Sequence, residues 1–123
     1  MASQTPTPIS AESILERYRA GNRDFRGIEL LDFSSLRGAD LSGADFSDSW
    51  LTAVDFSHAN LQQVRFDNCN VKTSDFRNAD LRGASFRNSA LCGASFSGAR
   101  IDGVHTEGAT FYGAPVDTLA PLV

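Results

Sequence analysis

The chain has 123 residues, a formal net charge of −4 at pH 7 and 41% hydrophobic residues, which is enough for one globular domain. No stretch approaches the roughly eighteen consecutive apolar residues of a membrane-spanning helix, so a membrane protein is not expected. Between Ser34 and Gly113 nine acidic residues stand against seven basic ones. A nucleic-acid-binding surface needs a clear basic excess, so direct nucleic-acid binding is not expected either.

The N-terminal segment predicts a disordered tail over residues 1–9. It is short, rich in Thr and Pro, and lacks any hydrophobic run. Neither the basic region nor the apolar region of a secretory signal is present, so we expect a cytoplasmic protein.

Residues 10–20 predict one short amphipathic helix. Ser10 is a suitable N-cap residue, and Ile14, Leu15 and Tyr18 share one helix face. A helix of two or three turns is not stable alone. Because the end of a solenoid exposes apolar residues and unpaired backbone, we expect this helix to cap the N-terminal end. The alternative is an interaction helix that does not pack on the domain.

From Ser34 to Gly113 a large central residue recurs every five positions, and a small residue (Ala, Ser, Cys or Val) precedes each by two. A five-residue period fits neither a helix nor a flat strand. It predicts a chain that turns a corner every five residues, with the small and the central residue of each repeat pointing inward. Fifteen of the sixteen central residues are apolar and form the predicted core, and the sixteenth is Thr106. The core residues, in order, are Leu36, Leu41, Phe46, Leu51, Phe56, Leu61, Phe66, Val71, Phe76, Leu81, Phe86, Leu91, Phe96, Ile101 and Phe111.

The repeats A-D-L-S-G, A-D-F-S-D, A-D-L-R-G, A-S-F-R-N and A-S-F-S-G resemble those of the pentapeptide repeat family. The resemblance implies an all-β solenoid, a right-handed quadrilateral (four-sided) parallel β-helix with four pentapeptides per coil. Taking every fourth central residue gives four walls that begin at Leu36, Leu41, Phe46 and Leu51. The first and third walls are rich in Phe and face each other, with aliphatic walls between them, so large and smaller residues alternate around the core.

The segment before Leu36 repeats out of phase. Leu30 fits the pattern, but the main register resumes six residues later, so we expect one extra residue between them as a bulge. Phe25 is not assigned to the core, because Arg23 would then point inward, and Phe33 is not assigned to any wall.

We therefore predict the solenoid over residues 22–114, with the regular register over 34–113, and a C-terminal tail over 115–123. Two arrangements stay open for this tail, which folds over the last coil or meets another chain. A homodimer would form through this C-terminal end or through the fourth wall.

The sequence contains no motif of an enzyme, cofactor site or metal centre. His58 and His105 fall on opposite walls, so they cannot share a metal ion. Cys69 is at an inward position and Cys92 at an outward one, so a disulfide is not expected. We predict that the protein is not an enzyme and binds no cofactor or metal.

The fourth wall has the fewest charges among its outward positions and carries the only Trp and one of the two Tyr. Low charge with exposed aromatics is typical of interface centres, although a merely neutral wall is the alternative. The candidate interaction residues are Trp50, Thr52, Asn70, Lys72, Cys92 and Tyr112. We predict a non-catalytic scaffold that presents flat faces to an unidentified protein partner.

The family resemblance implies an alternative function. Members that protect DNA gyrase from quinolones are thought to mimic duplex DNA with a long acidic rod. Such a protein would bind gyrase or another DNA-binding protein. The repeats of this chain, at nine acidic against seven basic residues, carry far less charge than a duplex, which has one per ~1.7 Å.

Overall fold

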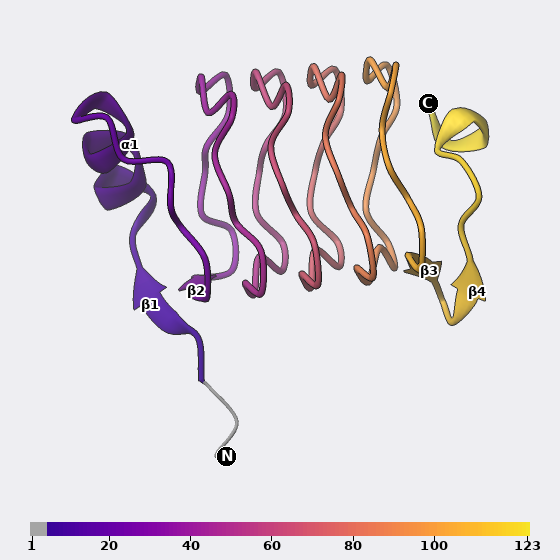
Figure 1. Cartoon of the computed structure of the whole chain (residues 1–123), viewed down its shortest axis with the longest axis horizontal. Helices are drawn as coiled ribbons and strands as arrows, with labels where there is room; N and C mark the ends of the chain where they lie inside the picture. Colours follow the sequence, from indigo (N-terminus) through magenta and orange to yellow (C-terminus); the bar gives the residue numbers. More distant parts are fainter. Residues whose placement is uncertain (1–4) are drawn as a thin grey trace.

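The computed structural model describes residues 5–123 as a rod of stacked coils, with a helix at one end and a short irregular segment at the other (Figure 1). The regular elements, in chain order, are β1 (Thr7–Ile9), α1 (Ala11–Arg19), β2 (Ile28–Leu30), β3 (Thr110–Phe111), β4 (Ala114–Pro115) and the 3-10 helix η1 (Ala120–Leu122). The tail expected over residues 1–9 lies outside the described residues at positions 1–4. At positions 7–9 that expectation is wrong, because these residues form β1.

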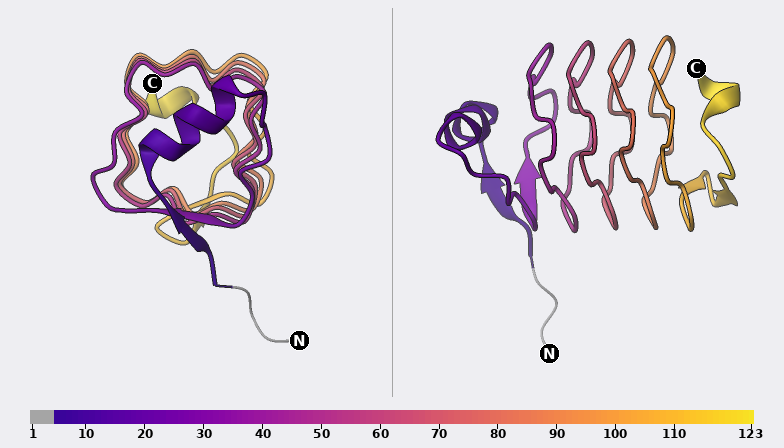
Figure 2. Two further views of the ribbon diagram at one scale, coloured as in Figure 1. Left: turned by 90° about the vertical axis from the view of Figure 1, so that its left-hand side faces the viewer. Right: turned by 45° about the horizontal axis from the view of Figure 1, so that its top comes forward.

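Between β2 and β3 the coils are joined by four ladders of parallel bridges. From Ser35 onward each bridge joins residues twenty positions apart, as in the ladder Asp40, Asn60, Asp80 and Arg100. Backbone groups therefore bond to the coil above and the coil below, and seen along the axis the coils superpose (Figure 2). The protein is a solenoid, with four pentapeptides in each coil.

The core is the column of space inside the coils. All thirteen central residues from Leu36 to Phe96 are fully or almost fully buried. Phe side chains stack along the axis within each wall, as Phe56 and Phe76 do with ring centroids 5.1 Å apart. Rings of facing walls meet edge to face, with Phe56 and Phe66 5.5 Å apart. Ile101 and Phe111 are only partly buried, because no further regular coil follows theirs.

Phe25 belongs to this core, contrary to the sequence-based expectation. Its side chain is 2% exposed, and its ring stacks on Phe46 with centroids 5.4 Å apart. Arg23 is exposed, and its guanidinium lies 3.5 Å from the centre of the Tyr18 ring. The expectation failed because Arg23 is where the chain enters the coil after α1. Its carbonyl oxygen accepts the N–H of Asp45 (2.8 Å), but its side chain turns outward onto the Tyr18 ring and does not follow the inward pattern of a regular repeat.

One extra residue interrupts the register of the first coil, as the sequence indicated. Glu29 is bridged to Trp50, twenty-one positions away, whereas Ser35 is bridged to Asp55, twenty positions away. The insertion therefore lies between Glu29 and Ser35. Phe33 lies in this segment with a φ of 66° and a side chain 86% exposed. A positive φ is uncommon for a bulky residue and marks a local strain.

Helix α1 and β1 cover much of the N-terminal end. Ser10 caps the helix, since its hydroxyl accepts the N–H of Ser13 (3.1 Å). Ile14 is completely buried, and Leu15 and Tyr18 are partly buried against the core. β1 adds a parallel strand to β2. The helix face that the sequence indicated thus lies on the solenoid.

The C-terminal segment folds back over the last coil. β3 and β4 form a hairpin whose two loop residues, Tyr112 and Gly113, both have positive φ, as in a type I′ turn. The Thr106 hydroxyl donates to the carbonyl oxygen of Asp117 (3.1 Å), and Leu119 is buried. Residues 115–123 therefore fold over the last coil, which is one of the two arrangements that the sequence left open.

The coil corners need left-handed backbone, and this gives a stability prediction at Gly38 (φ 69°), where an added Cβ would meet nothing within 4 Å. Alanine there should lower the free energy of unfolding by about 1 kcal/mol, since the left-handed region costs an L-residue that much. Asparagine tolerates this region and occupies the equivalent corner at Asn78 (φ 60°), so Gly38→Asn should cost less. Gly38→Val, with a β-branched side chain, should cost the most. The urea midpoints of the three variants measure the loss of stability, and equal losses for Asn, Ala and Val would contradict the prediction.

Candidate protein-interaction surface

The fourth wall of the solenoid, here called the Trp50 wall, contains the predicted interaction residues. One ladder joins Trp50, Asn70, Ala90 and Thr110 and gives this wall its backbone. Of the predicted interaction residues along it, Lys72 is exposed and Thr52, Asn70 and Cys92 are partly exposed. Trp50 is 49% exposed and Tyr112 is 73% exposed. Leu51, next to Trp50, is fully buried, so the backbone under the indole is fixed by the core.

The Trp50 wall extends further toward the N-terminus than the sequence indicated. Glu29 is bridged to Trp50 on one side and pairs with Pro8 of β1 on the other. The wall therefore carries Glu29 as a further charge beside Lys72, and Trp50 lies within the ladder rather than at its end. Sequence reasoning missed Glu29 because it precedes the regular register, although adding one residue to the repeat between Leu30 and Leu36 would have aligned it with Trp50.

Two more apolar side chains are exposed directly after β2. Leu31 is 69% exposed, and Phe33 lies in the extra-residue segment described above. With Trp50 they are the large apolar side chains exposed in the first two described coils. Monomeric proteins expose few such residues close together in the fold, and a group of them favours an interaction site.

The polar side chains of the Trp50 wall mostly serve the turns. The Asn70 carboxamide oxygen accepts the N–H of Lys72 (3.1 Å), and the Thr73 hydroxyl donates to the Lys72 carbonyl (2.6 Å). The Cys92 sulfur accepts the N–H of Tyr112 (3.0 Å). These bonds fix the turns that bound the wall.

The other cysteine, Cys69, is a core residue. Its thiol is buried and donates to the carbonyl oxygen of Phe46 (3.0 Å). Burial raises the pKa of the Cys69 thiol to about 12, so this group stays protonated at neutral pH. Both cysteines are free thiols.

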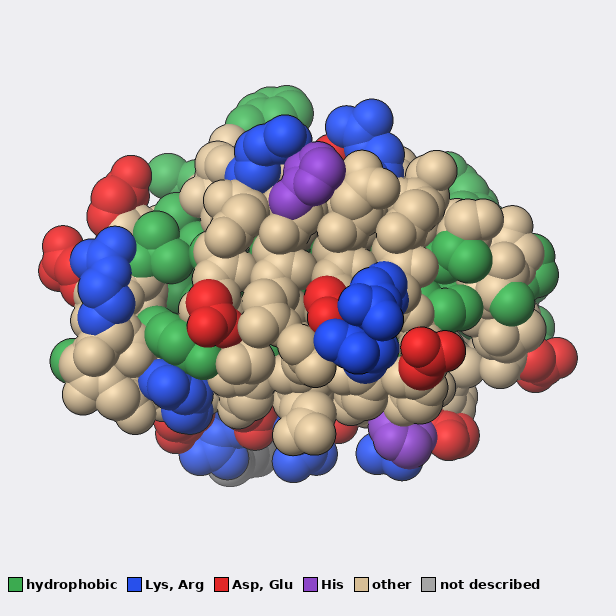
Figure 3. All heavy atoms as spheres, turned by 90° about the horizontal axis from the view of Figure 1, so that it is seen from above, with side chains coloured by type: hydrophobic (Ala, Val, Ile, Leu, Met, Phe, Trp, Pro, Cys, Tyr) green, Lys and Arg blue, Asp and Glu red, His purple; other side chains and the backbone are tan. Residues whose placement is uncertain are grey.

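Four arginines elsewhere on the solenoid pair with a carboxylate of the same repeat or of the next coil, whereas within residues 5–123 no salt bridge includes Asp40, Asp45, Asp48, Asp55 or Asp102. The pairs Arg65–Asp67, Arg77–Asp75, Arg82–Asp80 and Arg87–Glu107 have N–O distances of 3.1, 2.8, 2.7 and 2.9 Å. Hydrogen bonds from the neighbouring arginines lower the pKa of Asp75 and of Asp80. On the face seen in Figure 3, acidic and basic side chains are interspersed and do not gather by sign. This face therefore carries no wide field of one charge.

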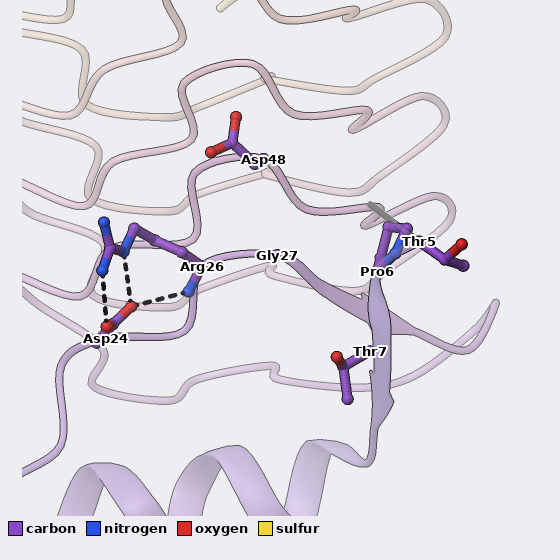
Figure 4. A pocket seen from close by; sticks show the side chains of 7 residues that line it. All are labelled: Thr5, Pro6, Thr7, Asp24, Arg26, Gly27 and Asp48. Carbon is purple, nitrogen blue, oxygen red and sulfur yellow. Dashed lines mark hydrogen bonds and ion pairs between the residues drawn. The ribbon is translucent and has the colours of Figure 1, made fainter. Parts of the chain in front are cut away.

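A polar pocket of about 600 Å³ lies beside β1 at the N-terminal end (Figure 4). The Asp24 carboxylate accepts two hydrogen bonds from the Arg26 guanidinium (2.9 and 3.0 Å), and this pairing lowers the pKa of Asp24 to about 2. Asp48 lies on the next coil, apart from this pair. Over residues 5–123, no group of three or more His, Cys, Asp or Glu side chains could hold a metal ion. In the same part of the chain, no helix is long and apolar enough to cross a membrane.

A family model for the pentapeptide repeat region matches residues 23–96, which is more than half of the chain. The chain belongs to the pentapeptide repeat family. No curated protein matches it.

Solved pentapeptide repeat structures resemble this one. Alr5209 from Nostoc PCC 7120 is 32% identical with a TM-score of 0.71, over 78% of each chain. Rfr23 from the cyanobacterium Cyanothece 51142 is 24% identical with a TM-score of 0.69, over 76% of this chain and 64% of Rfr23. QnrB1, a plasmid-mediated fluoroquinolone resistance protein, is 22% identical with a TM-score of 0.62, over 88% of this chain and 57% of QnrB1. At these identities Rfr23 and QnrB1 show a shared fold alone.

Proposed function

We propose that this pentapeptide repeat protein is a non-catalytic scaffold that presents the Trp50 wall to a protein partner. The observation that carries the proposal is a rigid, nearly uncharged ladder with exposed aromatic side chains. Tryptophan is enriched among residues that dominate binding energy, and a fixed backbone lowers the entropy lost on binding. A second copy of this chain is one such partner, in which case two Trp50 walls would pair.

The position of Trp50 makes it the anchor of this surface. Its side chain is about half exposed. The exposed half offers contact area to a partner, and the buried half is held in place by the neighbouring residues. Glu29 lies on the coil before Trp50 and Lys72 on the coil after it, so one charge of each sign flanks the indole along the wall. Aromatic side chains are enriched at interface centres, which favours Trp50 as the anchor.

Charge placed on the Trp50 wall should abolish association and leave the fold intact. We expect Trp50→Asp to remove partner binding or self-association, with a melting temperature close to that of the wild type, because Leu51 keeps the core filled. Pull-down from the native cells and static light scattering measure the two kinds of association. Asn70→Glu, the next residue of the ladder, should act in the same direction.

The matched control is Arg77→Glu on the first wall. Arg77 is exposed and lies away from the Trp50 wall, so this variant should keep every association of the wild type. If Trp50→Asp and Asn70→Glu also keep them all, the Trp50 wall is only a neutral surface and the proposal is wrong.

Mimicry of DNA is the alternative function. The fold shared with QnrB1, a fluoroquinolone resistance protein, suggests this alternative. The charge distribution of the chain disfavours it. A mimic needs long rows of unpaired carboxylates. Asp67, Asp75 and Asp80 each accept from an arginine two residues away, and the nine carboxylates of the repeats are nearly balanced by seven basic side chains. A supercoiling assay with purified DNA gyrase separates the two functions, since a scaffold that binds another protein should leave gyrase activity unchanged.

The proposed scaffold is a right-handed quadrilateral β-helix with α1 as its N-terminal cap. Four ladders per twenty-residue coil support the four-sided form. Parallel strands joined through crossovers are almost always right-handed, which supports the handedness. The burial of Ile14 supports the capping role of α1, and the absence of a catalytic family among the relatives supports a non-catalytic role.

A further inference from the structure

A second surface, around the corner of the coil from the Trp50 wall, lies between α1 and the first regular repeats. It is an open groove of about 550 Å³ lined by Leu15, Tyr18, Arg19, Arg23, Ser35, Leu36, Arg37, Ala39 and Asp40. Ligand pockets commonly have volumes of about 300–1,000 Å³. The groove exists because the solenoid starts partway round a coil, so that no coil precedes residues 35–40.

The floor of the groove is an unpaired edge of the solenoid. In later coils the N–H at this position bonds to the preceding coil, as Asp55 does with the Ser34 carbonyl (2.9 Å) and Asn60 with the Ala39 carbonyl (2.8 Å). For Ser35 and Asp40 no such partner precedes, and within residues 5–123 their N–H groups make no hydrogen bond. Unpaired strand edges readily add an extended segment from another chain.

The chain itself shows that this end accepts an extended segment. On the neighbouring wall β1 pairs in parallel with β2 and closes the edge there. At the groove only a side chain fills this role, since the Tyr18 hydroxyl donates to the edge carbonyl of Ser42 (2.7 Å). The edge at Ser35 and Asp40 remains open beside it.

Three arginines give the groove its charge. Arg19, Arg23 and Arg37 line it against one acidic residue, Asp40. Across residues 5–123 the salt bridges involve other arginines, and none includes these three. Arg23 uses one nitrogen on the carbonyls of Tyr18 and Asn22, and Arg37 one nitrogen on Ser57. A guanidinium has five donors, so both keep donors for an anion.

We infer that this groove, called the arginine groove, binds an extended acidic segment of a protein partner. Ser35 and Asp40 lie on adjacent walls, so the segment bends at the corner between them, as the coils do, and its carbonyl oxygens accept from both N–H groups. Its carboxylates pair with Arg19, Arg23 and Arg37, and its apolar side chains lie on Leu15 and Ala39, which are partly exposed. Charge complementarity selects an acidic segment, and the open backbone edge selects an extended one. The inference is independent of the Trp50 wall.

The test is an NMR titration of the full, ¹⁵N-labelled chain with a capped hexapeptide of alternating valine and glutamate. The amide signals of Ser35 and Asp40 should shift on binding. The double variant Arg19→Glu with Arg37→Glu should bind about tenfold more weakly or worse, because charge-assisted bonds are lost. Both side chains are exposed, so the variant should melt like the wild type.

Three controls decide the outcome. The same peptide with lysine in place of glutamate should give no shift, and Trp50→Asp should bind the glutamate peptide as the wild type does. The inference is overturned if the Ser35 and Asp40 signals do not move, or if the double variant binds unchanged. It is also overturned if oligothymidylate or inorganic phosphate gives the same shifts at lower concentration, which would assign the groove to a phosphate ligand.

Discussion

Phe66→Ala should lower the free energy of unfolding by about 3–5 kcal/mol, as truncating a buried Phe does in other cores. Phe66 is completely buried at the middle of the rod. Its ring stacks between Phe46 and Phe86, with centroids 5.7 and 5.0 Å away, and meets Phe56 and Phe76 edge to face at 5.5 and 5.6 Å. Alanine would leave a cavity that the flanking coils cannot close, because each is held by its own ladders. Urea denaturation followed by circular dichroism measures the loss.

The control for Phe66 is Arg77→Ala, which removes an exposed side chain on the first wall. The ion pair of Arg77 with Asp75 (2.8 Å) is on the surface, and such pairs contribute about 1 kcal/mol or less. A loss at Arg77 as large as that at Phe66 would mean that the stack of rings does not stabilise the rod, and the assignment of inward positions would fail.

Ile14→Asp should detach α1 from the N-terminal end and lower the free energy of unfolding by about 4 kcal/mol. Ile14 is completely buried, so the variant must bury a carboxylate or expose the end of the core. The second outcome would uncover Phe25 and Leu30 together with the unpaired edge, and association between chains should follow. Thermal melts and static light scattering report the two effects.

Glu16→Ala is the matched control on the same helix. Glu16 is exposed, and a surface change of this kind alters stability by about 0.5 kcal/mol or less. If Ile14→Asp remains monomeric with an unchanged melting temperature, α1 is an appendage and its capping role is wrong. That result would also remove one side of the arginine groove.

The two proposed surfaces rest on different physical features. The Trp50 wall is a finished ladder whose backbone groups are paired, so only side chains are available for binding. The arginine groove is an unfinished edge, where backbone N–H groups remain available. Binding to the Trp50 wall should therefore depend on the side chains of the wall alone. Binding to the arginine groove should depend in addition on the backbone carbonyl groups of the partner's segment.

The five-residue pattern by itself determined the coil. Inward and outward positions alternate locally, so the burial of residues such as Phe66 and Leu81 follows from their place in the repeat. The fourfold sorting of central residues also placed Trp50 and Asn70 on one wall, because the period of twenty is present in the sequence. Ser10, as the N-cap of α1, was likewise a local signal.

Only the tertiary structure decided what happens at the two ends. Phe25 enters the core and Glu29 joins Trp50 because the extra residue before Ser35 changes the pairing distance from twenty to twenty-one. β1 is too short to form by propensity and exists through its pairing with β2. The arginine groove exists because α1 packs against the first coil and supplies one of its sides. Such long-range packing has no period, so the repeat pattern could not reveal it.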